Sequence, residues 1–170
     1  MGAVHPHRRR LHQLRGAFSS QKLWLLSIAL NRRGYPRLAN GVRNLNSILF
    51  SNSLPVDAKV SPDVRLAHHA MGTVIHRKTV IGEGVTICQN VTIAVRPSWN
   101  APHDVVIDDD VFIGANSVII TSRKSGIHIG RGARIGAGAL VTHDVPPWAT
   151  VVSVPSRILI RDAEGEREHA

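Results

Sequence analysis

Aliphatic side chains recur every six residues over the second half of the chain, and this period restricts the possible folds more than any other feature. The step of six links ten residues in three series: Ile75, Ile81, Ile87 and Ile93, then Ile107, Ile113 and Ile119, then Ile129, Ile135 and Val141. In an α-helix that step is a turn of about 600°, which would scatter these side chains around the surface. Short strands joined by tight turns can place every one of them inward. The period therefore predicts a mainly β solenoid of stacked coils.

A second set of small or aliphatic residues lies four places after these anchors: Val85, Val91, Val111, Ser117, Ala133 and Ala139. Aromatic residues make up only 4% of the chain, which fits a core that repeats a small aliphatic unit. Each anchor that leaves water stabilises the stack by about 1.5–3 kcal/mol. We expect a charged residue at Ile87 or Ile113 to unfold the domain.

Two interruptions of the period mark predicted loops. The step from Ile93 to Ile107 is 14, so eight residues, 96–103, are expected to leave the coil. The step from Ile119 to Ile129 is ten and predicts a smaller excursion. Insertions on a solenoid project from a rigid scaffold, where functional residues concentrate. The longer loop, which carries His103, is therefore a candidate part of a site.

The N-terminal third carries the cationic character of the chain. The net charge is +9, and nine basic residues but no acidic residue precede Asp57. Apolar residues recur at helical spacing from Ser19 to Asn31 and from Arg37 to Phe50, with Gly34 and Pro36 between them. This pattern predicts a helical hairpin that either caps the open end of the solenoid or lies on an anionic membrane surface.

The chain is thus divided into a basic flexible arm, a helical cap or membrane-surface hairpin, a β-helix domain and a charged tail: residues 1–16, 17–52, 53–158 and 159–170. No apolar run reaches the roughly 20 residues that span a bilayer. The single cysteine, Cys88, excludes an internal disulfide and fits a reducing compartment. We expect a cytoplasmic protein that can contact the inner face of the membrane through its basic N-terminus.

Residues 53–157 resemble the serine acetyltransferase group of hexapeptide-repeat acyltransferases. Three segments carry the resemblance: His69-Ala70-Met71-Gly72, which is similar to the family's His-Ala-Thr-Gly, Gln89-Asn90-Val91-Thr92-Ile93, and Ile135-Gly136-Ala137-Gly138-Ala139 with Pro146-Pro147 and Val154-Pro155-Ser156-Arg157. The resemblance implies a left-handed parallel β-helix. The short helical start, with Trp24, looks nearer to the bacterial polysaccharide O-acetyltransferase branch.

The resemblance also implies transfer of acetyl from acetyl-CoA to a hydroxyl, in a homotrimer with sites between subunits. His69 and His103 would be the catalytic histidines, with His69 as the general base, because a neutral imidazole takes a proton readily near pH 7. The implied acceptor-binding residues are His68, Gln89 and Asn90. The implied cofactor-binding residues are Ala115, Arg131, Arg134, Gly136, Gly138 and Arg157. No metal is expected.

Departures from the family pattern bear on the acceptor. The family has Asp before the first histidine and Arg before the second, where this chain has His68 and Pro102, and a further family Asp corresponds to Leu54 or a neighbour. Such charges would bind the ammonium and carboxylate of an amino acid. A sugar, glycan or natural-product hydroxyl is therefore the expected acceptor, with L-serine as the alternative.

Other interpretations remain open. Gly136 and Gly138 could be turn residues only, and Cys88 is expected to pack, not to act as a nucleophile. A zinc enzyme like the γ-type carbonic anhydrases would need His69, His103 and His128 to converge on one metal. A non-catalytic scaffold or nucleic-acid binder would act through residues 1–16; we expect no nucleic-acid partner.

Overall fold

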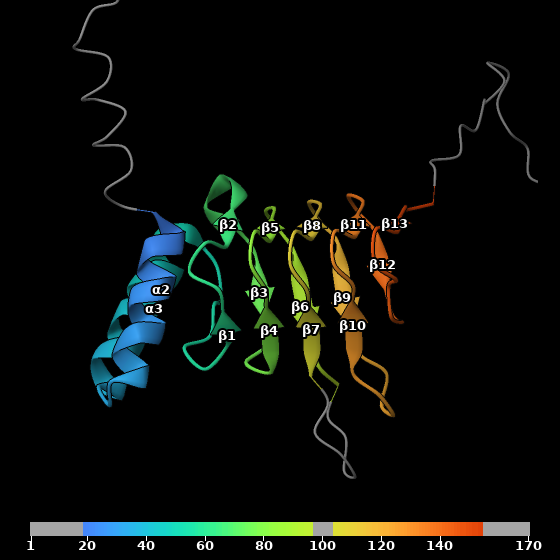
Figure 1. Ribbon diagram of the computed structural model, residues 1–170. Helices are drawn as coiled ribbons and strands as arrows, with labels where there is room; N and C mark the ends of the chain where they lie inside the picture. Colours follow the sequence, from blue (N-terminus) through green and yellow to red (C-terminus); the bar gives the residue numbers. More distant parts are fainter. Residues whose placement is uncertain (1–18, 97–103, 155–170) are drawn as a thin grey trace, which may run out of the picture.

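The fold is a stack of short strands with two helices at one end (Figure 1). It is known from a computed structural model that describes residues 19–96 and 104–154. The helical elements are α2 (Ser20–Arg32), α3 (Pro36–Phe50) and the short 3-10 helix η1 (Ala67–Ala70). The strands are β1 (Lys59–Val60), β2 (Arg65–Leu66), β3 (Val74–Ile75), β4 (Thr79–Ile81), β5 (Thr86–Ile87), β6 (Thr92–Ala94), β7 (Val105–Ile107), β8 (Phe112–Ile113), β9 (Val118–Ile120), β10 (Ile127–Ile129), β11 (Arg134–Ile135), β12 (Leu140–Val141) and β13 (Thr150–Val151).

Three parallel sheets form the sides of a solenoid. Sheet 1 has the order β1-β4-β7-β10, sheet 2 the order β2-β5-β8-β11-β13, and sheet 3 the order β3-β6-β9-β12. From β1 to β12, consecutive strands belong to successive sheets, so the chain visits each side once per coil. Ile75 accordingly pairs with Ile93, 18 residues later. The predicted solenoid of stacked coils is confirmed.

All ten six-step anchors are buried, none more than 4% exposed, and they form one core cluster. The register places each anchor on the one in the next coil, as in the pairs Ile87 with Ile113 and Ile113 with Ile135. The residues four places after the anchors are also buried. Both predictions about the core are therefore confirmed.

Many corners that follow an anchor of sheet 1 or sheet 2 have left-handed backbone at the third residue after that anchor. That position has a positive φ in six corners, at Gly84, Asn90, Asp110, Asn116, Gly132 and Gly138. Glycine adopts this conformation without a Cβ clash, and Asn and Asp tolerate it through local hydrogen bonds. The corner chemistry thus explains why these residue types follow the anchors.

The two helices close the N-terminal end of the core, and both lie within a residue or two of the predicted ranges. Ser19 caps α2 by accepting a hydrogen bond from the Lys22 amide at 3.2 Å. Trp24 is fully buried, and its indole Nε1 donates to the Pro55 carbonyl at 2.8 Å. Within residues 19–96 and 104–154, no helix is long and apolar enough to cross a membrane.

Candidate active site

Most of the predicted site residues lie along one edge of the solenoid, where sheet 2 turns into sheet 3. His68 and His69 occupy the first corner of this sheet 2–sheet 3 edge, and Gln89 with Asn90, Ala115, and Gly136 with Gly138 occupy the next three. Backbone hydrogen bonds join successive corners: Asn90 N to Met71 O at 2.8 Å, Asn116 N to Gln89 O at 3.2 Å and Gly138 N to Ala115 O at 2.8 Å. With strands about 4.8 Å apart, four corners span about 14 Å.

The corner with the histidines is larger than the others. Leu66 pairs with Ile87 and is therefore an anchor, but the next anchor, Ile75, follows after nine residues instead of six. The three extra residues form most of η1, which stands out beside β2 in Figure 1. A six-step count extended back to Leu66 would have revealed this third interruption in the sequence.

Three consecutive residues of this corner have left-handed backbone. The φ angles are 50° at His68, 58° at His69 and 50° at Ala70. For residues with a Cβ, this conformation costs about 1–2 kcal/mol each. Such strain persists where the surrounding structure enforces it, and it concentrates at functional sites. Here it leaves both imidazoles exposed while Ala70 is fully buried.

Two residues that sequence reasoning missed hold His69 in place. The Phe50 ring, at the end of α3, stacks on the His69 imidazole with centroids 4.8 Å apart and an interplanar angle of 25°. The Asn52 side-chain Nδ2 lies 3.5 Å from the His69 carbonyl oxygen and donates to Ser20 Oγ at 2.8 Å. The cap and the site are thus one packed unit, a relation between distant residues that no local pattern shows.

The glycines of the last edge corner have structural reasons of their own. Gly138 has a φ of 68°, and a Cβ on Gly136 would lie 2.9 Å from the Val151 carbonyl oxygen. Both are therefore required by the coil itself. Together with Ala115 they also keep this part of the edge free of bulky side chains, which suits an extended ligand lying along it.

Of the three predicted arginines, Arg131 and Arg134 are among the described residues, and neither lies in a corner of the sheet 2–sheet 3 edge. Arg131 is in the corner between sheets 1 and 2 and pairs with Asp109. Arg134 is on the outer face of sheet 2, with its guanidinium 5.9 Å from the centre of the Phe112 ring. The structure therefore separates Arg131 from the edge residues with which the sequence grouped it, because Arg131 follows the sheet 1 anchor Ile129 by two residues.

His103 and Arg157 lie outside the described residues. The chain leaves the described part after Arg96, beyond β6, and returns at Asp104, before β7. The ends of the predicted loop therefore lie at the edge between sheets 3 and 1, whereas His69 lies at the edge between sheets 2 and 3. The whole width of sheet 3 separates these two edges in one chain.

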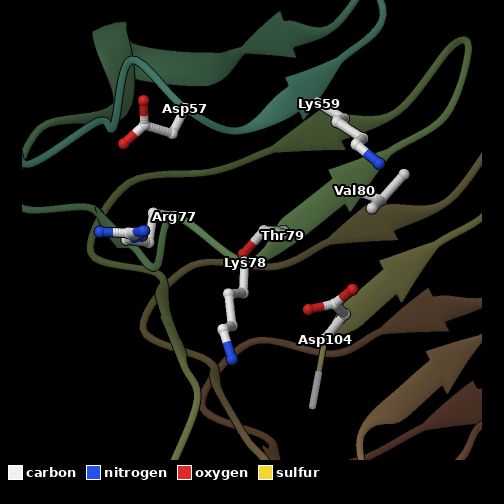
Figure 2. Close-up of a pocket in the computed structure, with 7 residues that line it drawn as sticks. All are labelled: Asp57, Lys59, Arg77, Lys78, Thr79, Val80 and Asp104. Carbon is white, nitrogen blue, oxygen red and sulfur yellow. The ribbon is translucent and has the colours of Figure 1, made fainter. Parts of the chain in front are cut away.

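A charged pocket lies beside Asp104, where the described chain resumes before β7. It has a volume of about 220 Å³ and is lined by Asp57, Lys59, Arg77, Lys78, Thr79, Val80 and Asp104. In Figure 2, Asp57 and Arg77 lie on one side, and Lys59 and Asp104 on the other. Within the described residues no ion pair joins these charges.

The remaining candidate residues have structural surroundings. Burial raises the pKa of the Cys88 thiol, which keeps it protonated and fits a packing role. The His128 Nε2 lies 3.0 Å from Asp108 Oδ1 on the outer face of β10. Strand β10 belongs to a coil three steps along the stack from the coil that holds His69, a separation of about 14 Å. Among the described residues no group of three or more His, Cys, Asp or Glu could hold a metal ion.

Known proteins share both the repeat and the fold. The hexapeptide repeat of succinyl-transferase matches residues 104–143. A serine acetyltransferase of Bacillus licheniformis is 38% identical over 96 residues, covering 56% of this chain and 43% of that protein. The serine acetyltransferase of Salmonella typhimurium is 32% identical over 157 residues, covering 92% of this chain and 55% of that protein.

Solved structures agree with the sequence comparison. Soybean serine acetyltransferase complexed with serine superimposes with a TM-score of 0.69 at 29% identity, over 82% of this chain and 56% of that chain. Serine acetyltransferase from Brucella abortus in complex with coenzyme A gives a TM-score of 0.67 at 28% identity, over 81% and 53% of the two chains.

The fold and the edge of stacked corners define a left-handed parallel β-helix of hexapeptide repeats, as predicted. Within that class, the chain is similar in sequence and in fold to the serine acetyltransferases. It spans about half the length of the curated relatives that it matches.

Proposed function

We propose that the chain is an acetyl-CoA-dependent O-acetyltransferase. The observation that carries the proposal is the sheet 2–sheet 3 edge, where the exposed His69 and the small residues Ala115, Gly136 and Gly138 lie in one column. An extended acyl-CoA arm lying along these small residues would bring its thioester toward His69. The coenzyme A bound by the Brucella abortus enzyme supports this cosubstrate.

His69 would act as the general base. Its imidazole takes the proton of the acceptor hydroxyl as the hydroxyl oxygen attacks the thioester carbonyl carbon. The tetrahedral intermediate then collapses, the carbon–sulfur bond breaks, and the imidazolium returns the proton to the departing thiolate. The stacked Phe50 and the Asn52 contact would keep the imidazole in one orientation during both transfers.

The acceptor that the comparisons favour is L-serine. Every relative and solved structure cited above is a serine acetyltransferase, and one of those structures holds serine. L-serine is therefore better supported as the acceptor than the sugar hydroxyl expected from the sequence. A sugar or glycan acceptor stays the second candidate because His68 and Pro102 stand where the family has charged partners for an amino acid.

We also propose a homotrimer with sites between subunits. A site that joins His69 to His103 would need two chains, because the ends of the loop lie across sheet 3 from His69. The outer face of sheet 3 carries a mainly apolar column of Val74, Thr92, Val118 and Leu140, in which Val74 is 46% and Leu140 63% exposed. Packing this column against a second subunit would remove it from water.

Thiol release from acetyl-CoA tests the function. The purified chain would be assayed with L-serine, L-homoserine, and free and nucleotide-linked sugars, beside His69→Ala and the control His143→Ala at another corner. We expect His69→Ala to lose about 10²–10⁴-fold and His143→Ala to keep its activity. Activity on L-serine supports the first acceptor, and activity on sugars alone supports the second. Equal rates for His69→Ala and the unsubstituted chain would refute the general-base role.

A further inference from the structure

One side of α3 exposes an apolar stripe. Leu38, Val42, Leu45 and Leu49 follow one another at alternating steps of four, three and four, which places them on one face of the helix. Leu38, Leu45 and Leu49 are 61%, 43% and 52% exposed. Ile48, beside the stripe, is 79% exposed. Ala39 and Asn46, in contrast, are buried, so the stripe is separate from the face that packs inside the protein.

The stripe extends to the turn between the helices. Tyr35 is 56% exposed, and residues 34–38 line an open hollow of about 400 Å³. An exposed tyrosine beside exposed leucines is typical of a surface that meets the boundary between lipid and water. The apolar surface therefore runs from the turn to nearly the end of α3, a length of about 20 Å at 1.5 Å per residue.

The charged side chains of the α2–α3 hairpin itself all have one sign. Residues 19–56 contain five basic residues and no acidic residue: Lys22, Arg32, Arg33, Arg37 and Arg43. Arg32, Arg33 and Arg37 are exposed around the turn. Such a surface complements a partner that is anionic as well as apolar. A second copy of the same hairpin does not meet this condition, because it would bring Arg37 and its neighbours against like charges.

We propose that the α2–α3 hairpin docks on an anionic lipid bilayer through the α3 stripe. Helices with an apolar face and basic neighbours lie in the interface with the apolar side chains among the acyl chains and the cations at the headgroups. Because Phe50, the last residue of α3, stacks on His69, docking would hold the histidine corner near the bilayer surface. The docking itself does not depend on the proposed acetyl transfer.

Vesicle co-sedimentation of the full chain tests the proposal. The vesicles would be phosphatidylcholine alone or phosphatidylcholine with about one-third phosphatidylglycerol. We expect the unsubstituted protein to bind only the anionic vesicles. We expect the Leu45→Glu/Ile48→Glu variant to bind those vesicles at least tenfold more weakly. The matched control is Val152→Glu, which also puts Glu in place of an exposed apolar residue (77% exposed). Val152 directly follows β13, which lies at the opposite end of the solenoid from α3 (Figure 1).

Three outcomes would overturn the proposal. No binding to anionic vesicles refutes it directly. Equal binding by the unsubstituted chain and by Leu45→Glu/Ile48→Glu would assign the lipid contact to another basic segment, such as residues 1–16. A lower molar mass of Leu45→Glu/Ile48→Glu in light scattering without lipid would make the stripe a contact between copies. Circular dichroism of all variants checks that the helices remain folded. We expect them to remain folded because the substituted residues are exposed.

Discussion

At the residue scale, the left-handed backbone of His68 makes a prediction about stability. A β-branched residue fits this conformation worst, whereas Asn and Gly tolerate it. We expect His68→Val to lower the free energy of unfolding by about 1–2 kcal/mol and His68→Asn to leave it nearly unchanged. Urea unfolding of the three proteins measures this. A His68→Val variant as stable as His68→Asn would show that this corner is not strained.

A second residue-scale prediction concerns pH. Burial, together with the neighbouring Lys78 and Arg77, lowers the pKa of His76 below its ordinary value of 6.5. The unfolded chain then binds a proton at His76 more readily than the folded protein, so stability present above pH 6.5 is lost as the pH falls through the lowered pKa. We expect the melting temperature of His76→Gln to fall less steeply between pH 7 and pH 5. Parallel melting curves would contradict this.

At the element scale, stability depends on the inward anchors. Ile113 is fully buried and pairs with anchors on both sides, so Ile113→Ala leaves a cavity inside the stack. We expect a loss of about 2–5 kcal/mol in the free energy of unfolding. The control Thr86→Ala, on the neighbouring strand with an outward side chain, should lose less than about 1 kcal/mol. Similar losses for both variants would contradict the packing of the core.

The arrangement of the strands also shows which features of the fold and the candidate site could be predicted from the sequence. A strict period of six determines which residues point inward, so the coils and the corners that hold Asn90 and Gly138 follow from spacing alone, whereas the enlarged corner of His69 interrupts the period. Spacing also places Arg131, two residues after Ile129, at the corner between sheets 1 and 2, but it does not report that Asp109 from the preceding coil pairs with it. Nor does it report that Phe50 meets His69, since that contact depends on how α3 packs on the first coil.

At the scale of the whole molecule, sheet 3 predicts how subunits assemble. Val74→Glu/Leu140→Glu places charges on the exposed apolar column, and burying unpaired charges in an interface is costly. We expect this variant to change from trimer to monomer in light scattering and to lose thiol release. The control Thr150→Glu, exposed on sheet 2, should stay trimeric. A variant that stays trimeric would place the interface on another face.

Mixed assemblies test whether a site joins two chains. His69→Ala and His103→Ala chains would be unfolded, mixed in equal amounts and refolded, after each alone has been shown to be inactive. If each site takes one histidine from each of two neighbouring subunits, random assembly pairs an intact His69 with an intact His103 in about one site in four. Thiol release should then recover to about a quarter of that of the unsubstituted protein. A site within one chain gives no recovery, because every chain in the mixture lacks one of the two histidines.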